Sequence, residues 1–134
     1  MKANILVIED HPDVSNAMVL LLERAGCKAV AAETGVQGLA LAKDRHFDVI
    51  TLDIDLPGIS GLEVCRFLKR DPALCHIPVI FISGRGCDEN IRHGLALGAV
   101  DYITKPFEGL AFISRVLSHV GKKDRCEASM TLPG

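Results

Sequence analysis

The stretch Val49-Ile50-Thr51-Leu52-Asp53, followed directly by Ile54-Asp55-Leu56-Pro57-Gly58, decides the fold of this chain. Four consecutive apolar or β-branched residues are typical of a strand that is buried on both faces, as in a parallel sheet. The Pro-Gly pair predicts a turn as the chain leaves that sheet. Asp53 is therefore expected at the carboxyl end of a central strand, where it either caps the turn or carries chemistry.

The composition indicates one folded unit. The 134 residues are enough for one domain with one core, and 49% hydrophobic with 24% charged residues is ordinary for a globular protein. The net charge of −2 creates no field that would attract nucleic acid or an anionic membrane. We therefore expect no direct binding to nucleic acid and none to membranes.

Nothing in the sequence indicates a secreted or membrane-spanning protein. The amino terminus has no signal-peptide pattern, and no apolar stretch approaches the roughly 20 residues of a membrane span. The five cysteines are odd in number and include no Cys-x-x-Cys pair, which argues against a disulfide framework and a zinc site. We expect reduced thiols in a cytoplasmic protein.

Further apolar runs predict four more strands, each followed by a helical pattern. The runs cover residues 5–8, 27–32, 79–82 and 100–103. Five strand-helix pairs favour an α/β fold with an open, doubly wound parallel sheet and right-handed crossovers. We expect the flavodoxin-like (βα)5 arrangement with strand order 2-1-3-4-5, in which ligands bind at the carboxyl ends of the first and third strands.

The spacing of apolar residues predicts which side of each helix is buried. Thr34 and Ser60 are expected to cap the second and third helices. Inward-facing positions are expected at Val36, Leu39 and Ala40 in the second helix, at Ile91, Leu95 and Ala96 in the fourth, and at Leu110, Ile113, Val116, Leu117 and Val120 in the last.

Polar residues end four of the predicted strands. They are Glu9 and Asp10, Asp53, Ser83 and Lys105. Parallel strands place their carboxyl ends at one rim, where three carboxylates would repel one another unless a cation such as Mg²⁺ holds them ionised. Asp53 could then attack phosphorus, while the Lys105 ammonium and the Ser83 hydroxyl contact phosphoryl oxygens.

Taken together, these motifs resemble the receiver domain of bacterial two-component response regulators over residues 4 to about 121. The chain carries them in the family's order: Glu9-Asp10, Leu52-Asp53-x-Asp55-Leu56-Pro57-Gly58-x-x-Gly61, Ser83 and Lys105-Pro106. The resemblance implies a receiver domain at residues 1–121. Residues 122–134 would be a carboxyl-terminal tail or linker.

The resemblance also implies a phosphorelay function. Asp53 would accept a phosphoryl group from a sensor histidine kinase or a histidine phosphotransfer protein in a Mg²⁺-dependent reaction. The domain would catalyse its own phosphotransfer and autodephosphorylation without being a conventional enzyme. Asp10 and Asp53 would bind the metal through their side chains, Asp55 through its backbone carbonyl and Glu9 through water. The Lys105-Pro106 peptide bond would be cis.

Ser83 and Tyr102 correspond to the switch residues of that family. Ser83 would move toward the phosphate and Tyr102 would rotate into the vacated space, which would alter the surface of the last two helices and the strand between them. That surface would bind a downstream protein or a fused output domain, or form a phosphorylation-dependent dimer. Asp55 and Arg85 occupy positions that tune phosphoryl lifetime in the family.

Other interpretations stay open. Glu9-Asp10 alone could complement the dipole of a helix that begins near Pro12, and Tyr102 alone could be an ordinary strand aromatic. Asp53-x-Asp55 also matches haloacid-dehalogenase-like aspartyl-phosphate phosphohydrolases, although Leu56-Pro57-Gly58 departs from their motif and 134 residues leave no room for a cap domain. A pseudo-receiver that only binds partners is the remaining alternative.

Overall fold

The computed structural model describes residues 2–84 and 88–122, in which strands and helices alternate along the chain. The elements are β1 (Asn4–Ile8), α1 (Pro12–Arg24), β2 (Lys28–Ala32), α2 (Gly35–Asp44), β3 (Val49–Asp53), α3 (Gly61–Arg70), β4 (Val79–Ser83), α4 (Asp88–Ala96), β5 (Asp101–Thr104) and α5 (Gly109–His119). The described strands pair in parallel in the order β2-β1-β3-β4-β5. The predicted flavodoxin-like α/β fold is confirmed.

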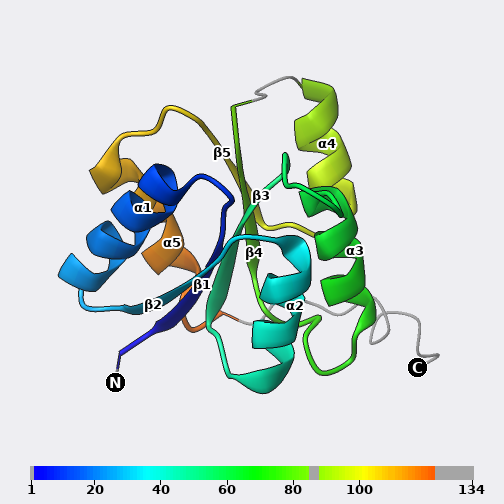
Figure 1. Cartoon of the computed structure of the whole chain (residues 1–134), viewed down its shortest axis with the longest axis horizontal. Helices are drawn as coiled ribbons and strands as arrows, with labels where there is room; N and C mark the ends of the chain where they lie inside the picture. The colour runs from blue at the N-terminus through cyan, green and yellow to red at the C-terminus, as the bar shows by residue number, and fades with distance from the viewer. Residues whose placement is uncertain (1, 85–87, 123–134) are drawn as a thin grey trace.

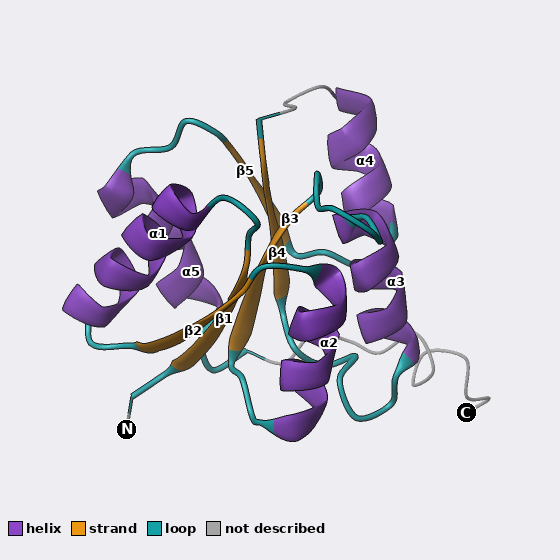
Figure 2. Cartoon of the chain, viewed as in Figure 1, coloured by secondary structure: helices purple, strands orange, loops and turns teal. Residues whose placement is uncertain are grey.

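Helices cover both faces of the sheet. Figures 1 and 2 show α1 and α5 on one face and α2, α3 and α4 on the other. Successive residues of β1 alternate between the two layers: Leu6 and Ile8 pack under α2, α3 and α4, whereas Ile5 and Val7 pack under α1 and α5. A strand buried on both faces needs apolar residues at every position, which explains the continuous apolar runs.

Local sequence signals set the helix ends. The Thr34 hydroxyl accepts a hydrogen bond from the Gln37 N–H, and the Ser60 hydroxyl accepts one from the Glu63 N–H. Both predicted caps are therefore confirmed. Gly26, with φ of +92°, follows the end of α1 in the left-handed region that glycine adopts most easily.

The predicted apolar sides of α2, α4 and α5 are partly wrong. Exposed side chains among the predicted inward positions are Val36, Ala40, Leu95, Ala96, Leu110 and Leu117, and Leu110 is 79% exposed. Glycine packs against the sheet in two of these helices, since a Cβ on Gly38 would lie 2.3 Å from Ile8 and one on Gly94 would lie 2.7 Å from Phe81. In α5 the fully buried side chains are Phe112 and Val116.

Three further expectations concern cysteines, membrane segments and the carboxyl-terminal segment. Cys27 and Cys65 are in the thiol form, but Cys75 is disulfide-bonded, so the expectation of five reduced thiols is wrong. The absence of a Cys-x-x-Cys pair does not rule out a disulfide bond formed outside such a motif. None of the described helices is long and apolar enough to cross a membrane. Of the predicted tail or linker at residues 122–134, all but Lys122 lie outside the described residues, and so does Arg85.

Candidate functional site

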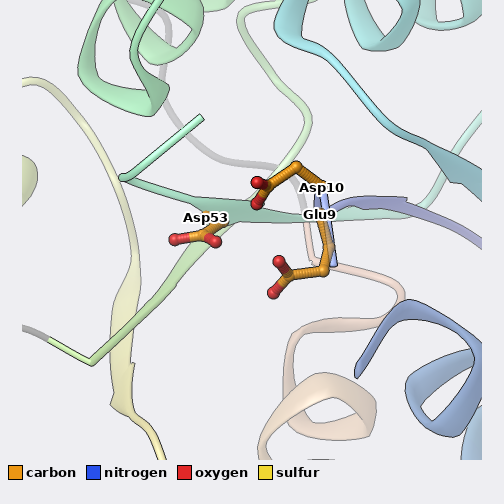
Figure 3. A group of neighbouring side chains, drawn as sticks. All are labelled: Glu9, Asp10 and Asp53. Carbon is orange, nitrogen blue, oxygen red and sulfur yellow. The ribbon is translucent and has the colours of Figure 1, made fainter. Parts of the chain in front are cut away.

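Adjacent strands bring three carboxylates to one edge of the sheet. Ile8 of β1 lies beside Leu52 of β3, so Glu9, Asp10 and Asp53 follow at the same level. Their carboxylate oxygens lie within 4.8 Å of one another, and Figure 3 shows the three side chains around a shared space. The structure thus brings together the three acidic residues that sequence patterning placed at this rim.

Lys105 reaches this acidic group from the end of β5. Its Nζ forms ion pairs with Glu9 Oε1 and with Asp53 Oδ2, the second at 3.2 Å. Glu9 is 2% exposed and Asp53 is 5% exposed, so both carboxylates are nearly removed from water. A buried carboxylate needs a charged or hydrogen-bonding partner because desolvation of an isolated charge is costly. The Lys105-Pro106 peptide bond is cis, as the resemblance implies.

The electrostatics of the rim favour a proton on Asp53. Burial, and then the negative charge of Glu9, raise the pKa of Asp53 to about 6, although Lys105 and the Asp55 N–H partly oppose this. Burial also acts to raise the pKa of Glu9, but hydrogen bonds from Lys105 and the His11 N–H outweigh it and lower that pKa. Asp53 is therefore the carboxyl that loses its charge first as pH falls.

The donor set fits a hard divalent cation. Asp10 Oδ1 is buried and has no hydrogen-bond partner within the described part of the chain. Buried polar atoms usually have a partner, so an orphaned carboxylate oxygen beside two further carboxylates points to a missing positive group. Oxygen ligands of this kind are those that Mg²⁺ prefers. The acidic cluster is therefore compatible with Mg²⁺ binding.

The remaining predicted residues surround the rim without joining the acidic cluster. The Asp55 N–H donates to Asp53 Oδ1 at 3.1 Å, while the Asp55 side chain is exposed. Ser83 is buried at the end of β4, and its carbonyl accepts a hydrogen bond from the Lys105 N–H at 2.8 Å. Tyr102 is buried on β5 beside Phe81 of β4, with ring centroids 6.4 Å apart.

Two features of the site were not found by sequence reasoning. The first is the direct pairing of Glu9 with Lys105 across 96 positions. The second is a groove of about 480 Å³, mostly apolar, beside Lys105. It is lined by Asp13, Val14, Ala17, Lys105, Pro106 and Phe107. No local pattern marks either feature, because the ion pair joins residues that follow β1 and β5, and the groove depends on how α1 and the segment after β5 meet in space.

Comparison with known proteins gives consistent relatives. The sequence model of the family described as response regulator receiver domain matches residues 5–117. The phosphate regulon transcriptional regulatory protein PhoB of Pseudomonas aeruginosa is 40% identical over 123 residues, which is 90% of this chain and 54% of PhoB. The polar-differentiation response regulator DivK of Brucella ovis is 36% identical over 124 residues, 90% of this chain and 98% of DivK. The chain thus spans about half the length of PhoB and nearly all of DivK.

Solved structures show the same architecture. The receiver domain of the Francisella response regulator 1452 superposes with a TM-score of 0.82 at 29% identity, covering 87% of this chain and 95% of that chain. Chemotaxis protein CheY4 of Vibrio cholerae gives a TM-score of 0.85 over 90% of this chain and 100% of that chain; at 23% identity it supports the fold alone. Sequence and fold therefore agree, and the chain belongs to the response regulator receiver domain family.

Proposed function

We propose that this chain is a phosphorylation-dependent signalling switch that accepts a phosphoryl group on Asp53 in a Mg²⁺-dependent reaction. The observation that carries the proposal is the position of Asp53, a nearly buried carboxylate with Glu9 and Asp10 on one side and Lys105 Nζ at 3.2 Å. A structural turn cap would need neither the acidic neighbours nor the lysine.

Asp53 acts as the nucleophile. One carboxylate oxygen attacks the phosphorus of a phosphohistidine, the phosphorus–nitrogen bond breaks, and the departing imidazole takes up a proton. The Asp55 N–H orients the carboxylate by holding its Oδ1. Lys105 favours the charged form of Asp53 and then contacts an oxygen of the transferred group as a point charge.

The acidic residues hold the metal. Asp10 and Asp53 would bind Mg²⁺ through their side chains, Asp55 through its backbone carbonyl and Glu9 through water. Bound there, the cation supplies positive charge against the phosphoryl oxygens. The buried Asp10 Oδ1, which has no hydrogen-bond partner among the described residues, supports the assignment of Asp10 as a metal ligand. Glu9 already has a cationic partner in Lys105, which suits an indirect role.

The donor is a protein, either a sensor histidine kinase or a histidine phosphotransfer protein. The groove beside Lys105 supports this choice, because Val14, Ala17 and Phe107 offer apolar surface next to the lysine that pairs with Asp53. A small phosphate ester would not need such a surface. Lys105 thus belongs both to the groove and to the acceptor site.

Ser83 and Tyr102 transmit the phosphorylated state. The Ser83 carbonyl on β4 accepts a hydrogen bond from the N–H of Lys105, which directly follows β5. Tyr102 lies on β5, so movement at Ser83 reaches its strand directly. The Arg115 side chain donates to the Tyr102 carbonyl and links that strand to α5. The surface of α4, β5 and α5 is the proposed site for a downstream protein, a fused output domain or a second phosphorylated copy.

Incubation with Mg²⁺ and acetyl phosphate, followed by intact mass spectrometry, tests the acceptor. We expect one phosphoryl adduct on the protein, none on Asp53→Asn, and an unchanged adduct on Asp44→Asn, which alters an exposed carboxylate at the end of α2. An adduct that persists on Asp53→Asn would overturn the assignment. Beryllofluoride, a phosphoryl mimic, should shift amide resonances of β5 and α5, and Tyr102→Ala should reduce those shifts.

The same preparation separates the alternative functions. Turnover of a generic phosphomonoester would favour the aspartyl-phosphate phosphohydrolase. Failure to take up any phosphoryl group with Mg²⁺ present would favour a pseudo-receiver. A stable adduct without phosphomonoester turnover supports the signalling switch.

A further inference from the structure

A second groove lies between α2 and α3, away from the phosphoacceptor rim. It has a volume of about 410 Å³. Its lining residues are Leu39, Lys43, Phe67, Arg70, Asp71 and Leu74. The two helices lie side by side on one face of the sheet (Figure 1), and a Cβ on Gly35 of α2 would lie 2.5 Å from Val64 of α3. This close approach leaves the groove over the carboxyl-terminal halves of the helices.

The groove combines core-packed and exposed apolar side chains. Leu39 and Leu74 line it and also pack into the core, whereas Phe67 is 53% exposed. Val36, one turn before Leu39 and outside the groove lining, is 66% exposed. Val36, Leu39 and Lys43 repeat at spacings of three and four and so share one side of α2. Exposed apolar surface gathered in a concave site is typical of a binding surface rather than of ordinary solvent-facing residues.

The rim of this groove is cationic. Lys43 stands in the last turn of α2 and Arg70 in the last turn of α3, and both are exposed. Within the described part of the chain neither forms an ion pair, whereas Arg66 on the same helix pairs with Glu63 at 3.2 Å. Asp71 is the opposing charge, and its Oδ1 accepts the Ala73 N–H at 2.9 Å. An apolar floor between two unpaired cations is complementary to an acidic, amphipathic ligand.

We propose that the α2–α3 groove binds an acidic segment of another protein. The segment inserts one bulky apolar side chain over Phe67 and Leu39, and its flanking carboxylates pair with Lys43 and Arg70. The groove is separate from the proposed output surface of α4, β5 and α5. Binding at the groove does not depend on Asp53, so the proposal stands or falls independently of the phosphoacceptor assignment.

Selection of short random peptides displayed on phage tests the inference, with the whole chain as bait. We expect enriched sequences to contain one aromatic or large aliphatic residue flanked by Asp or Glu. An enriched peptide, made synthetically, should shift the amide resonances of Leu39, Phe67 and Leu74. It should bind Asp53→Asn as well as it binds the unaltered protein. Enrichment of sequences without carboxylates, or no enrichment at all, would overturn the proposal.

Matched variants show whether charge complementarity drives binding. The double variant Lys43→Glu/Arg70→Glu should bind the peptide roughly tenfold more weakly, because two attractions become repulsions. Phe67→Ser should weaken it about as much through loss of the apolar contact. Asp71→Asn keeps the oxygen that caps Ala73 but removes the opposing charge, so it should bind more tightly. Arg24→Glu, which alters an exposed cation in the last turn of α1, is the control and should bind normally.

Two other occupants would contradict the proposal. If a chain truncated after Lys122 binds the peptide and the full chain does not, the segment from residue 123 on covers the groove instead. If the protein sediments as a dimer that Phe67→Ser converts to a monomer, the groove is an interface between two copies of the chain. Peptide binding by a monomeric full chain supports the acidic partner.

Discussion

At the scale of single residues, the ion pair between Glu9 and Lys105 shows that the acidic rim contains a structural contact as well as candidate metal ligands. Glu9 is 2% exposed, and without a metal its main stabilising partner is the lysine at the opposite edge of the site. Lys105 therefore stabilises the fold by compensating the buried charge of Glu9 before any phosphoryl group is transferred. Sequence patterning placed both residues at strand ends, but no pattern pairs two side chains 96 positions apart.

Lys105→Met should destabilise the metal-free protein. The change leaves Glu9 and Asp53 buried without their cation, and breaking a buried ion pair costs about 3–5 kcal/mol. We expect roughly 2–3 kcal/mol here, because Lys105 is partly exposed and Asp53 can take up a proton. Urea denaturation with EDTA present measures the free energy of unfolding. Lys28→Met, at an exposed position on β2, should change it by less than about 0.5 kcal/mol. Equal stability of the two variants would contradict the structural role of Lys105.

Asp10→Asn should weaken Mg²⁺ binding by at least about tenfold, which corresponds to about 1.4 kcal/mol. The substitution keeps the shape of the side chain and removes the negative charge at the unpartnered oxygen. Calorimetric titration of Mg²⁺ measures the affinity, and phosphorylation by acetyl phosphate at limiting Mg²⁺ should fall with it. Asp13→Asn, an exposed carboxylate in the first turn of α1, is the control. Unimpaired phosphorylation of Asp10→Asn at limiting Mg²⁺ would show that Asp10 is not a ligand.

At the scale of elements, the strands were easier to predict than the faces of the helices. A strand buried on both sides needs an apolar residue at every position, so β1, β3 and β4 are visible as continuous runs. The helices approach the sheet through Gly38 and Gly94, which a hydrophobic pattern does not count as buried. Val36 and Leu95 were therefore assigned to the core although both are exposed.

Gly61→Ala should disturb the element contact that supports the phosphoacceptor. A Cβ at position 61 would lie 2.1 Å from the Asp53 carbonyl oxygen, so either α3 or the end of β3 must move. We expect a loss of roughly 1–3 kcal/mol in unfolding free energy, the usual cost of an overpacked contact, together with slower phosphorylation. Chemical denaturation and the acetyl phosphate reaction measure the two effects.

Gly109→Ala is the matched control for this substitution. Its added Cβ would meet the side chain of Leu21 at 3.2 Å, and a flexible side chain can move aside where a backbone carbonyl cannot. Its effect should stay below about 1 kcal/mol. If Gly61→Ala is as mild as Gly109→Ala, the close packing of α3 on the end of β3 does not constrain Asp53.

At the scale of the whole molecule, the order of strands is what turns local patterns into a site. Glu9, Asp53 and Lys105 lie at the carboxyl ends of three different strands, and the order 2-1-3-4-5 sets the first two of these strands side by side. The repeat of strand-helix pairs predicts the parallel sheet, and this strand order belongs to the flavodoxin-like arrangement expected for it. The sequence did not allow the two grooves to be predicted, because each depends on how two helices or a helix and a loop pack. Holding buried carboxylates close together at the rim lowers the free energy of unfolding of the whole domain.

That effect should appear as a dependence of stability on pH. The pKa of Asp53 is about 6 in the folded protein against an ordinary value of 3.8. Between these values the unfolded chain has lost the proton and the folded protein still holds it, so the contribution of Asp53 to stability falls as pH rises from about 4 to about 6. Asp53→Asn should remove this loss of stability with rising pH, because asparagine does not titrate. At pH 7, with EDTA, the variant should be about 1–2 kcal/mol more stable than the unaltered protein, below the limit of roughly 3 kcal/mol that the full shift allows.

Mg²⁺ should reverse this difference, because a cation bound to the ionised rim stabilises the protein that retains Asp53 more than the variant that lacks this carboxylate. Saturation at about 100 times the dissociation constant adds about 2.7 kcal/mol to the unfolding free energy. Thermal unfolding from pH 4 to 7, with EDTA or with Mg²⁺, measures both effects, and Asp44→Asn controls for the loss of an exposed carboxylate. A difference between Asp53→Asn and the unaltered protein that stays constant across this range in EDTA would mean that Asp53 titrates normally. The burial of Asp53 beside Glu9 would then not lower the free energy of unfolding.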